Sequence, residues 1–282
     1  MIPARQELLS GMTVISLCIN TPGPVAAARL ADMGASVTKI EPPAGDPLKT
    51  FAPEWYASLA SKQRMVTLDL KNPDERQELE TLLKEADLLL ASSRPSALRR
   101  LQLDWKSVHA RHPRLCLVGI VGYPEPLEER SGHDLTYLAS AGLVNAPQLP
   151  PSLFVDLAGA ERCVSLALAL LLRRARTGEA GFAAVSLYYC AFELAAPIRA
   201  GLTSPGGMLR GSHPLYGLYE AADGWIAVAA LEPHFAERLL AGLSLHQPDR
   251  EKLAGAFRQR NAAEWEQWAI EHDLPLAAAH RP

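Results

Sequence analysis

The sequence predicts an α/β protein, with a Rossmann-like parallel sheet in a large domain that precedes a smaller α+β domain. In the first two thirds of the 282 residues, short and almost purely apolar runs alternate with amphipathic helical patterns. Strands of a parallel sheet are buried on both faces, so they read as continuous apolar runs joined by helices. Past residue 196 the chain becomes rich in proline and glycine, which predicts a connection to a second domain.

Six runs have the length and apolar character of buried strands. The clearest three are Thr13–Leu17, Ser36–Ile40 and Leu115–Val121. The other three are Met65–Leu70, Asp87–Ala91 and Phe182–Leu187.

Helical patterns lie between these runs. The first has Pro24 near its start and Gly34 just past its end, the usual asymmetry of a helix. The second opens with Asn72 before Pro73, which predicts an N-cap followed by a first-turn proline. A strongly apolar segment, residues 157–176, predicts a core helix.

The domain boundaries follow from these patterns. We expect a large α/β domain over residues 1–195, a linker over 196–207 and a small α+β domain over 208–282. Within the small domain, the Asp223-Gly224 pair predicts the turn of a hairpin. Helices are expected there at about 234–243 and 262–271.

Composition excludes several classes of protein. A net charge of −3, with cations spread along the chain, disfavours nucleic acid or an anionic membrane as the main partner. The sequence contains no run of eighteen uncharged apolar residues, so no membrane span is predicted. The four cysteines form no C-x-x-C pair, which predicts reduced thiols, a cytoplasmic location and no zinc site.

Common cofactor and nucleophile motifs are absent from the sequence. There is no phosphate loop, no G-x-S-x-G elbow and no paired histidine spacing for a metal. Thr21–Pro24 stands where a dinucleotide loop would, but it holds a single glycine. Two classes of protein remain open: an α/β enzyme without a metal or nicotinamide cofactor, and a binding protein.

The stretch SGHDLTYLAS places His133 and Asp134 side by side before an apolar run. One interpretation is a helix start, with the polar residues binding backbone N–H groups. The other is that His133 is an acid/base group whose partner lies elsewhere in the chain. These residues alone leave both open.

Several segments in the same order carry a resemblance to a known family: GMTVISLCINTPGPVAAARLADMGASVTKIEPPAGDP, MVTLDLKNPDERQELETLLKEADLLLASSRP, SGHDLTY, VDLAGAERCVSLALALLLRRARTGEAGFAAVSLYY and PLYGLYEAADGWIAVAALEPHF. They resemble the family III (CaiB/BaiF-like) CoA-transferases, the group that also contains α-methylacyl-CoA racemases. The resemblance implies the family III fold, an acyl-CoA thioester as substrate, a homodimer of interlocked chains, and no cofactor beyond the CoA moiety.

The resemblance also implies site residues. In the transferases an aspartate attacks the thioester; in the racemases that aspartate and a histidine exchange the proton at the α-carbon, and a glutamate supports the histidine. The matching positions here are Asp156, His133 and Glu232. Because the transferases mostly carry another residue in place of the histidine, the three together favour the racemase branch.

The chemistry agrees with these residue types. A racemase needs two bases with opposite protonation states, which a histidine and a buried carboxyl with a raised pKa can supply. The enolate oxygen needs hydrogen-bond donors, and a helix from Leu157 would place its N-terminal amides beside Asp156. Each of the two acids also has a purely structural interpretation. Asp156 could cap the helix from Leu157, and Glu232 could be a first-turn acid of the helix that follows it.

The phosphates of CoA require arginine or lysine. The positions that match the family's CoA-contacting cations are Lys39, Arg64 and Arg94, and Lys62 is a fourth candidate. Solvation at the surface is the alternative for each.

Three features depart from the family pattern. The connection from His133 to Asp156 is short, Pro124-Glu125-Pro126 replaces a turn with glycine and glutamine, and the family's C-terminal return segment is absent from the sequence. The expected function is therefore an acyl-CoA racemase or epimerase. The alternatives are an acyl-CoA:carboxylate CoA-transferase with Asp156 as nucleophile, and a non-catalytic acyl-CoA-binding or repurposed member.

Overall fold

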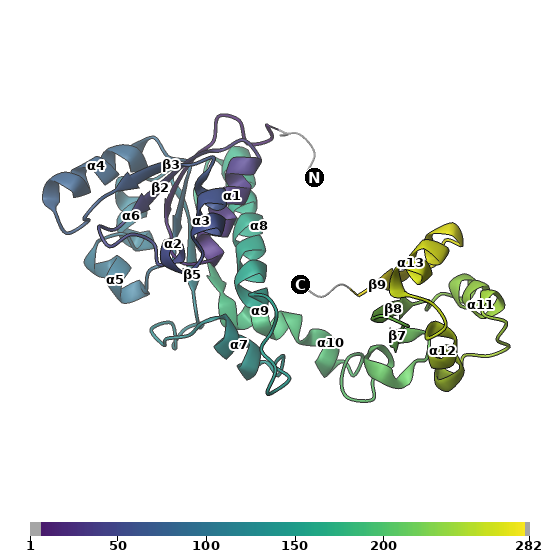
Figure 1. The fold of residues 1–282 in the computed structure, drawn as a ribbon. Helices are drawn as coiled ribbons and strands as arrows, with labels where there is room; N and C mark the ends of the chain where they lie inside the picture. Colours follow the sequence, from purple (N-terminus) through teal and green to yellow (C-terminus); the bar gives the residue numbers. More distant parts are fainter. Residues whose placement is uncertain (1–6, 280–282) are drawn as a thin grey trace. The chain divides into compact units, whose positions relative to one another are not determined.

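The computed structural model describes residues 7–279 and divides the chain into two compact units, Met1–Ala195 and Ala196–Pro282 (Figure 1). The boundary between the units falls where the first predicted domain ends. Each unit has its own apolar core and is described here by itself. The outermost residues of both predicted domains, 1–6 and 280–282, lie outside the described part of the chain.

The first unit contains a six-stranded parallel sheet with the order β3-β2-β1-β4-β5-β6. The strands are β1 (Thr13–Leu17), β2 (Ser36–Glu41), β3 (Arg64–Thr67), β4 (Leu88–Ala91), β5 (Cys116–Val121) and β6 (Phe182–Ser186). All six predicted strands are confirmed, with ends that differ by up to three residues. This strand order is that of doubly wound sheets. Strands β1 to β3 are added towards one edge and β4 to β6 towards the other, so the strand order reverses between β1 and β4.

Helices cover both faces of this sheet (Figure 1). They are α1 (Pro22–Asp32), α2 (Leu48–Phe51), α3 (Pro53–Ala60), α4 (Pro73–Lys84), α5 (Pro95–Arg100), α6 (Trp105–Arg111), α7 (Asp134–Ser140), α8 (Phe154–Thr177) and α9 (Leu187–Leu194). Successive strand residues face opposite layers: Val14 packs in the core with α1 and α8, and Ile15 packs in the core with α4 and α6.

Local sequence signals explain several of these helices. Asn72 caps α4 as predicted, because its side chain accepts a hydrogen bond from the Asp74 N–H at 3.0 Å. Gly23 lets α1 begin close to the end of β1, since a Cβ at this position would stand 2.1 Å from the Cys18 Cβ. All four cysteines are buried and free of disulfides, as the sequence predicts.

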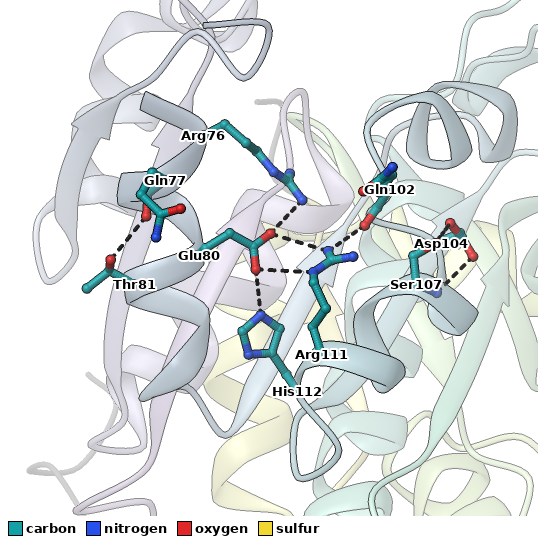
Figure 2. Close-up of polar contacts among 9 residues, drawn as sticks. All are labelled: Arg76, Gln77, Glu80, Thr81, Gln102, Asp104, Ser107, Arg111 and His112. Carbon is teal, nitrogen blue, oxygen red and sulfur yellow. Dashed lines mark hydrogen bonds and ion pairs between the residues drawn. The ribbon is translucent and has the colours of Figure 1, made fainter. Parts of the chain in front are cut away.

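A charged cluster joins α4 to the end of α6 (Figure 2). Glu80 accepts hydrogen bonds from Arg76 at 2.6 Å, Arg111 at 3.3 Å and His112 at 2.7 Å. Partial burial alone would raise the pKa of Glu80, but the hydrogen bonds from His112 and Arg111 and the charges of both arginines outweigh it and hold the pKa below its usual value.

This cluster predicts a pH-dependent contribution to stability. We expect Glu80→Gln to lower the free energy of unfolding by roughly 2 kcal/mol at neutral pH, because three cationic or polar partners lose a carboxylate. A lowered folded-state pKa contributes stability above the unfolded value, about 4.3, and that contribution is lost as the pH falls through the folded pKa.

Urea unfolding at several pH values measures the effect. The gap between wild type and Glu80→Gln should shrink from pH 6 towards pH 3. Glu78→Gln, on the exposed face of the same helix, is the matched control and should stay close to wild type. A gap that is constant over this pH range would contradict the prediction.

The second unit is a small α+β fold. Strands β7 (Tyr216–Glu220) and β8 (Trp225–Ala229) form the predicted antiparallel hairpin, and β9 (Leu276–Ala278) adds to its edge. The helical segments of this unit are α10 (Ala196–Arg199), η1 (Met208–Ser212), α11 (Pro233–Gly242), α12 (Arg250–Phe257) and α13 (Ala262–Glu271). The sequence did not predict α10, η1, α12 or β9, and α10 lies within the predicted linker.

Within residues 7–279, no helix is both long enough and apolar enough to cross a membrane.

Candidate functional site

A cavity of about 310 Å³ lies at the carboxyl ends of β1, β4 and β5. In a doubly wound sheet the crevice between β1 and β4 is the position where ligands bind, because neighbouring loops lead to opposite faces there. Among the polar residues that line the cavity are Asn20, Ser93, Arg94, Arg130, His133 and Asp156. The structure therefore brings two of the three predicted catalytic residues to one cavity.

His133 stands at the N-terminus of α7. It is the N-cap residue, with an extended backbone of φ −138° and ψ 167°. Its N–H donates to the Thr136 hydroxyl at 3.0 Å, and that hydroxyl donates to the His133 carbonyl at 2.8 Å. These bonds fix the backbone and leave an exposed imidazole at the cavity wall. The predicted helix start is confirmed, whereas the acid/base role of His133 stays a prediction that its place at the cavity allows.

Asp156 lies in the first turn of α8, where its half-buried side chain lines the same cavity. Burial raises its pKa first, and the nearby Asp134 carboxylate raises it further; a hydrogen bond from the Thr21 side chain opposes both. The resulting pKa is about 7. At neutral pH this carboxyl can therefore either donate or accept a proton.

Helix α8 begins at Phe154, three residues before the predicted start, and Asp156 is not its cap. The cap comes from α7 instead. The Asp134 Oδ1 accepts hydrogen bonds from the Val155 N–H at 2.7 Å and from the Asp156 N–H at 2.9 Å. Because these amides are bound, the predicted anion site at the start of α8 is already filled by a carboxylate.

Hydrogen bonds attach the loop that leads to His133 to the start of α5. Arg94 donates to the Ser131 hydroxyl at 2.7 Å. Glu129 accepts from the Ser96 N–H at 2.7 Å and from the Ser96 hydroxyl at 2.8 Å. Of the four predicted CoA-binding cations, Arg94 is the one that lines the cavity with His133 and Asp156.

Lys39 has a different environment from the predicted one. Its side chain is 2 % exposed, and the ammonium contacts Glu41 at 2.8 Å and Asp46 at 2.5 Å. Asp46 also accepts from the Asn20 N–H at 2.9 Å, which holds the loop after β1 at the cavity. This placement fits a buried ion pair and does not fit the predicted contact with a CoA phosphate.

The other two predicted cations are exposed and away from this cavity. Lys62 forms an ion pair with Asp32. Arg64 begins β3, and its side chain makes no hydrogen bond or ion pair within residues 7–279. A second, largely apolar hollow of about 200 Å³ lies beside the first at the ends of β1, β2 and β3, and the two share Ile19 and Ser93.

Glu232 lies in the second unit. It is the exposed residue before Pro233 at the start of α11, and its side chain makes no capping hydrogen bond. Its predicted contact with His133 would join the two units and stays a prediction.

Comparison with known proteins decides the family. Residues 9–282 match CoA-transferase family III. The chain belongs to this family. It is 30% identical to the human alpha-methylacyl-CoA racemase, over 91% of this chain and 74% of the relative. It is 29% identical to the cinnamoyl-CoA:phenyllactate CoA-transferase of Clostridium sporogenes, over 89% of this chain and 67% of that relative.

Solved structures agree with the family III fold. The Mycobacterium tuberculosis hypothetical protein Rv3272 superposes with a TM-score of 0.83 at 25% identity, over 96% of this chain and 83% of the other. A CAIB/BAIF family protein from Brucella suis gives a TM-score of 0.78 at 22% identity, over 97% of this chain and 84% of the other, which supports the fold.

Two residues of this family III site were missed from the sequence. Arg130 lines the cavity, and its guanidinium lies 4.6 Å from the ring centroid of Tyr123. Thr21 hydrogen-bonds Asp156 although the two lie on different elements. Arg130 directly precedes Ser131-Gly132-His133, so its place near the predicted histidine could have been predicted from the sequence. No local sequence pattern predicts the contact of Thr21 with Asp156. The described residues hold no cluster of three or more side chains suited to a metal.

Proposed function

We propose that this family III chain is an acyl-CoA racemase or epimerase that removes and returns the proton at the carbon α to a CoA thioester. The observation that carries the proposal is that one cavity holds both an imidazole, His133, and a carboxyl, Asp156, whose pKa is about 7. A two-base reaction requires two proton-transfer groups in one site, and a carboxyl with a pKa of about 7 can act as either acid or base.

The His133 imidazole takes the α-proton as the electrons of the C–H bond move into the thioester carbonyl, which forms an enolate. The protonated Asp156 then gives its proton to the opposite face of the α-carbon, and the C=O bond reforms. The site is left with an imidazolium and a carboxylate, the state that catalyses the reverse direction. No cofactor beyond the CoA moiety takes part.

Support also comes from a relative, since an alpha-methylacyl-CoA racemase is 30% identical over most of this chain. A second candidate is an acyl-CoA:carboxylate CoA-transferase in which ionised Asp156 attacks the thioester carbonyl, and the 29% identical transferase favours it. We further propose that the chain acts as a homodimer and that Glu232 supports His133 in the assembled site.

A deuterium experiment separates these functions. The chain is incubated with a single enantiomer of a 2-methylacyl-CoA in D₂O, and mass spectrometry and chiral chromatography follow the α-carbon. Deuterium incorporation with inversion of configuration is the expected result, and the inversion should be lost in His133→Ala. CoA transfer to an added carboxylate without α-deuteration, retained in His133→Ala and lost in Asp156→Asn, would overturn the racemase in favour of the transferase.

A further inference from the structure

We propose that Asp134 is the positioning residue of this site: it fixes the spacing between His133 and Asp156 and keeps Asp156 as the proton donor of the pair. The proposal rests on the racemase function proposed above.

The spacing between His133 and Asp156 depends on one carboxylate oxygen. The Asp134 Oδ1 binds the N–H of Asp156 itself and that of its neighbour Val155, at 2.9 and 2.7 Å. Asp134 directly follows His133 and is 5% exposed. The backbone of one proton-transfer group is therefore tied to the residue next to the other. Without this contact, the packing of α7 against α8 and a connection of more than twenty residues would remain as the links between them.

The contact also compensates for the missing local cap of α8. The N-cap position is Leu153, which has no capping side chain. The free N–H groups of a helix start must find an acceptor, and here the acceptor comes from another helix. Loss of the Asp134 carboxyl would leave the backbone N–H groups of Val155 and Asp156 without this acceptor.

The same two amides would otherwise stabilise the charge of Asp156 itself. A helix N-terminus favours a carboxylate in its first turn, which would lower the pKa of Asp156. Because the amides donate to Asp134, their effect is largely cancelled, and the Asp134 charge acts on Asp156 as a like charge. Desolvation and this charge together hold the pKa of Asp156 at about 7.

Other polar and charged groups surround Asp156. They are Thr21 before α1, Tyr137 on α7, and the cavity residues Arg94, Glu128, Arg130 and His133. Of these, Thr21 lowers the pKa of Asp156 through a hydrogen bond. Asp134 differs from these in being bonded to the Asp156 backbone, so its charge is held at a fixed distance.

Two variants separate the cap from the charge. Asp134→Asn keeps an oxygen acceptor for both N–H groups and removes the charge, whereas Asp134→Ala removes both. The pKa of Asp156 is read without substrate from the ¹³C shift of its carboxyl carbon, assigned by its disappearance in Asp156→Asn. Glu129 lies on the same loop and its carboxylate accepts hydrogen bonds from Ser96 at the start of α5. Glu129→Gln is therefore the matched control for loss of one negative charge.

We expect Asp134→Asn to lower the pKa of Asp156 by roughly one unit and to move the alkaline limb of the exchange rate by the same amount. Its maximal rate should stay within about threefold of wild type. In Asp134→Ala the maximal rate should fall by about 10- to 100-fold, because the two groups lose their fixed spacing. Glu129→Gln should leave the pKa of Asp156 in place.

An unchanged Asp156 titration in Asp134→Asn would overturn the charge part of the proposal. An Asp134→Ala protein that folds and keeps the wild-type maximal rate would overturn the spacing part. Absence of α-exchange in the wild type would refute the proposed function instead, and the ¹³C titration would still decide whether Asp134 controls Asp156.

Discussion

Asp156→Asn is expected to lower kcat for racemisation of a 2-methylacyl-CoA by about 10²- to 10⁴-fold, while α-proton exchange survives for one enantiomer. His133 and Asp156 line the same cavity, and each would serve one face of the α-carbon. With Asp156 disabled, His133 can still remove and return a proton on its own face. The enantiomer that presents its proton to the other face becomes inert.

His133→Ala should show the complementary pattern. Exchange should survive for the opposite enantiomer, with Asp156 as the base. Since a base must be ionised and the pKa of Asp156 is about 7, this residual exchange should rise as the pH increases through 7. Deuterium content and configuration, measured for each enantiomer separately, test both variants.

His109→Ala is the matched control for loss of an imidazole, because His109 stacks on Trp105 with ring centroids 4.5 Å apart and does not line the cavity. It should racemise both enantiomers at close to the wild-type rate. If Asp156→Asn and His133→Ala lost exchange of the same enantiomer, the two residues would not act on opposite faces.

The sheet could be predicted from sequence because its signal is local. Buried parallel strands such as β1 and β4 are continuous apolar runs, and Asn72-Pro73 marks a helix start without reference to the rest of the chain. The start of α8 was misplaced by three residues since its cap, Asp134, lies about twenty positions upstream in another helix. No local pattern at Leu153 reports that contact.

The site was predicted unevenly for a similar reason. His133 and Asp156 came from the family resemblance, and the structure places both at one cavity. Lys39 was predicted to contact the ligand because its position matches a CoA-contacting cation of the family, although its place inside a parallel strand should have indicated burial. Its partner Asp46 is only seven residues away, so an ion pair was open to prediction.

Lys39→Met is expected to lower the free energy of unfolding by about 3–5 kcal/mol, because it leaves the buried carboxylates of Glu41 and Asp46 without their cation. The three side chains are 2%, 10% and 0% exposed, so water cannot replace the missing charge. The Tyr56 hydroxyl donates to Glu41 at 2.8 Å, but a neutral donor compensates for only part of the loss.

Lys62→Met provides the comparison. Lys62 and Asp32 are 41% and 44% exposed, and an exposed pair of this kind contributes about 0–1 kcal/mol. Urea unfolding of the two variants at one pH therefore compares the same chemical change in a buried and an exposed pair. Equal losses would contradict the argument from burial. Because Asp46 also holds the Asn20 N–H, Lys39→Met should in addition weaken the loop at the cavity, which amide hydrogen exchange of residues 18–21 would detect as faster exchange than in Lys62→Met.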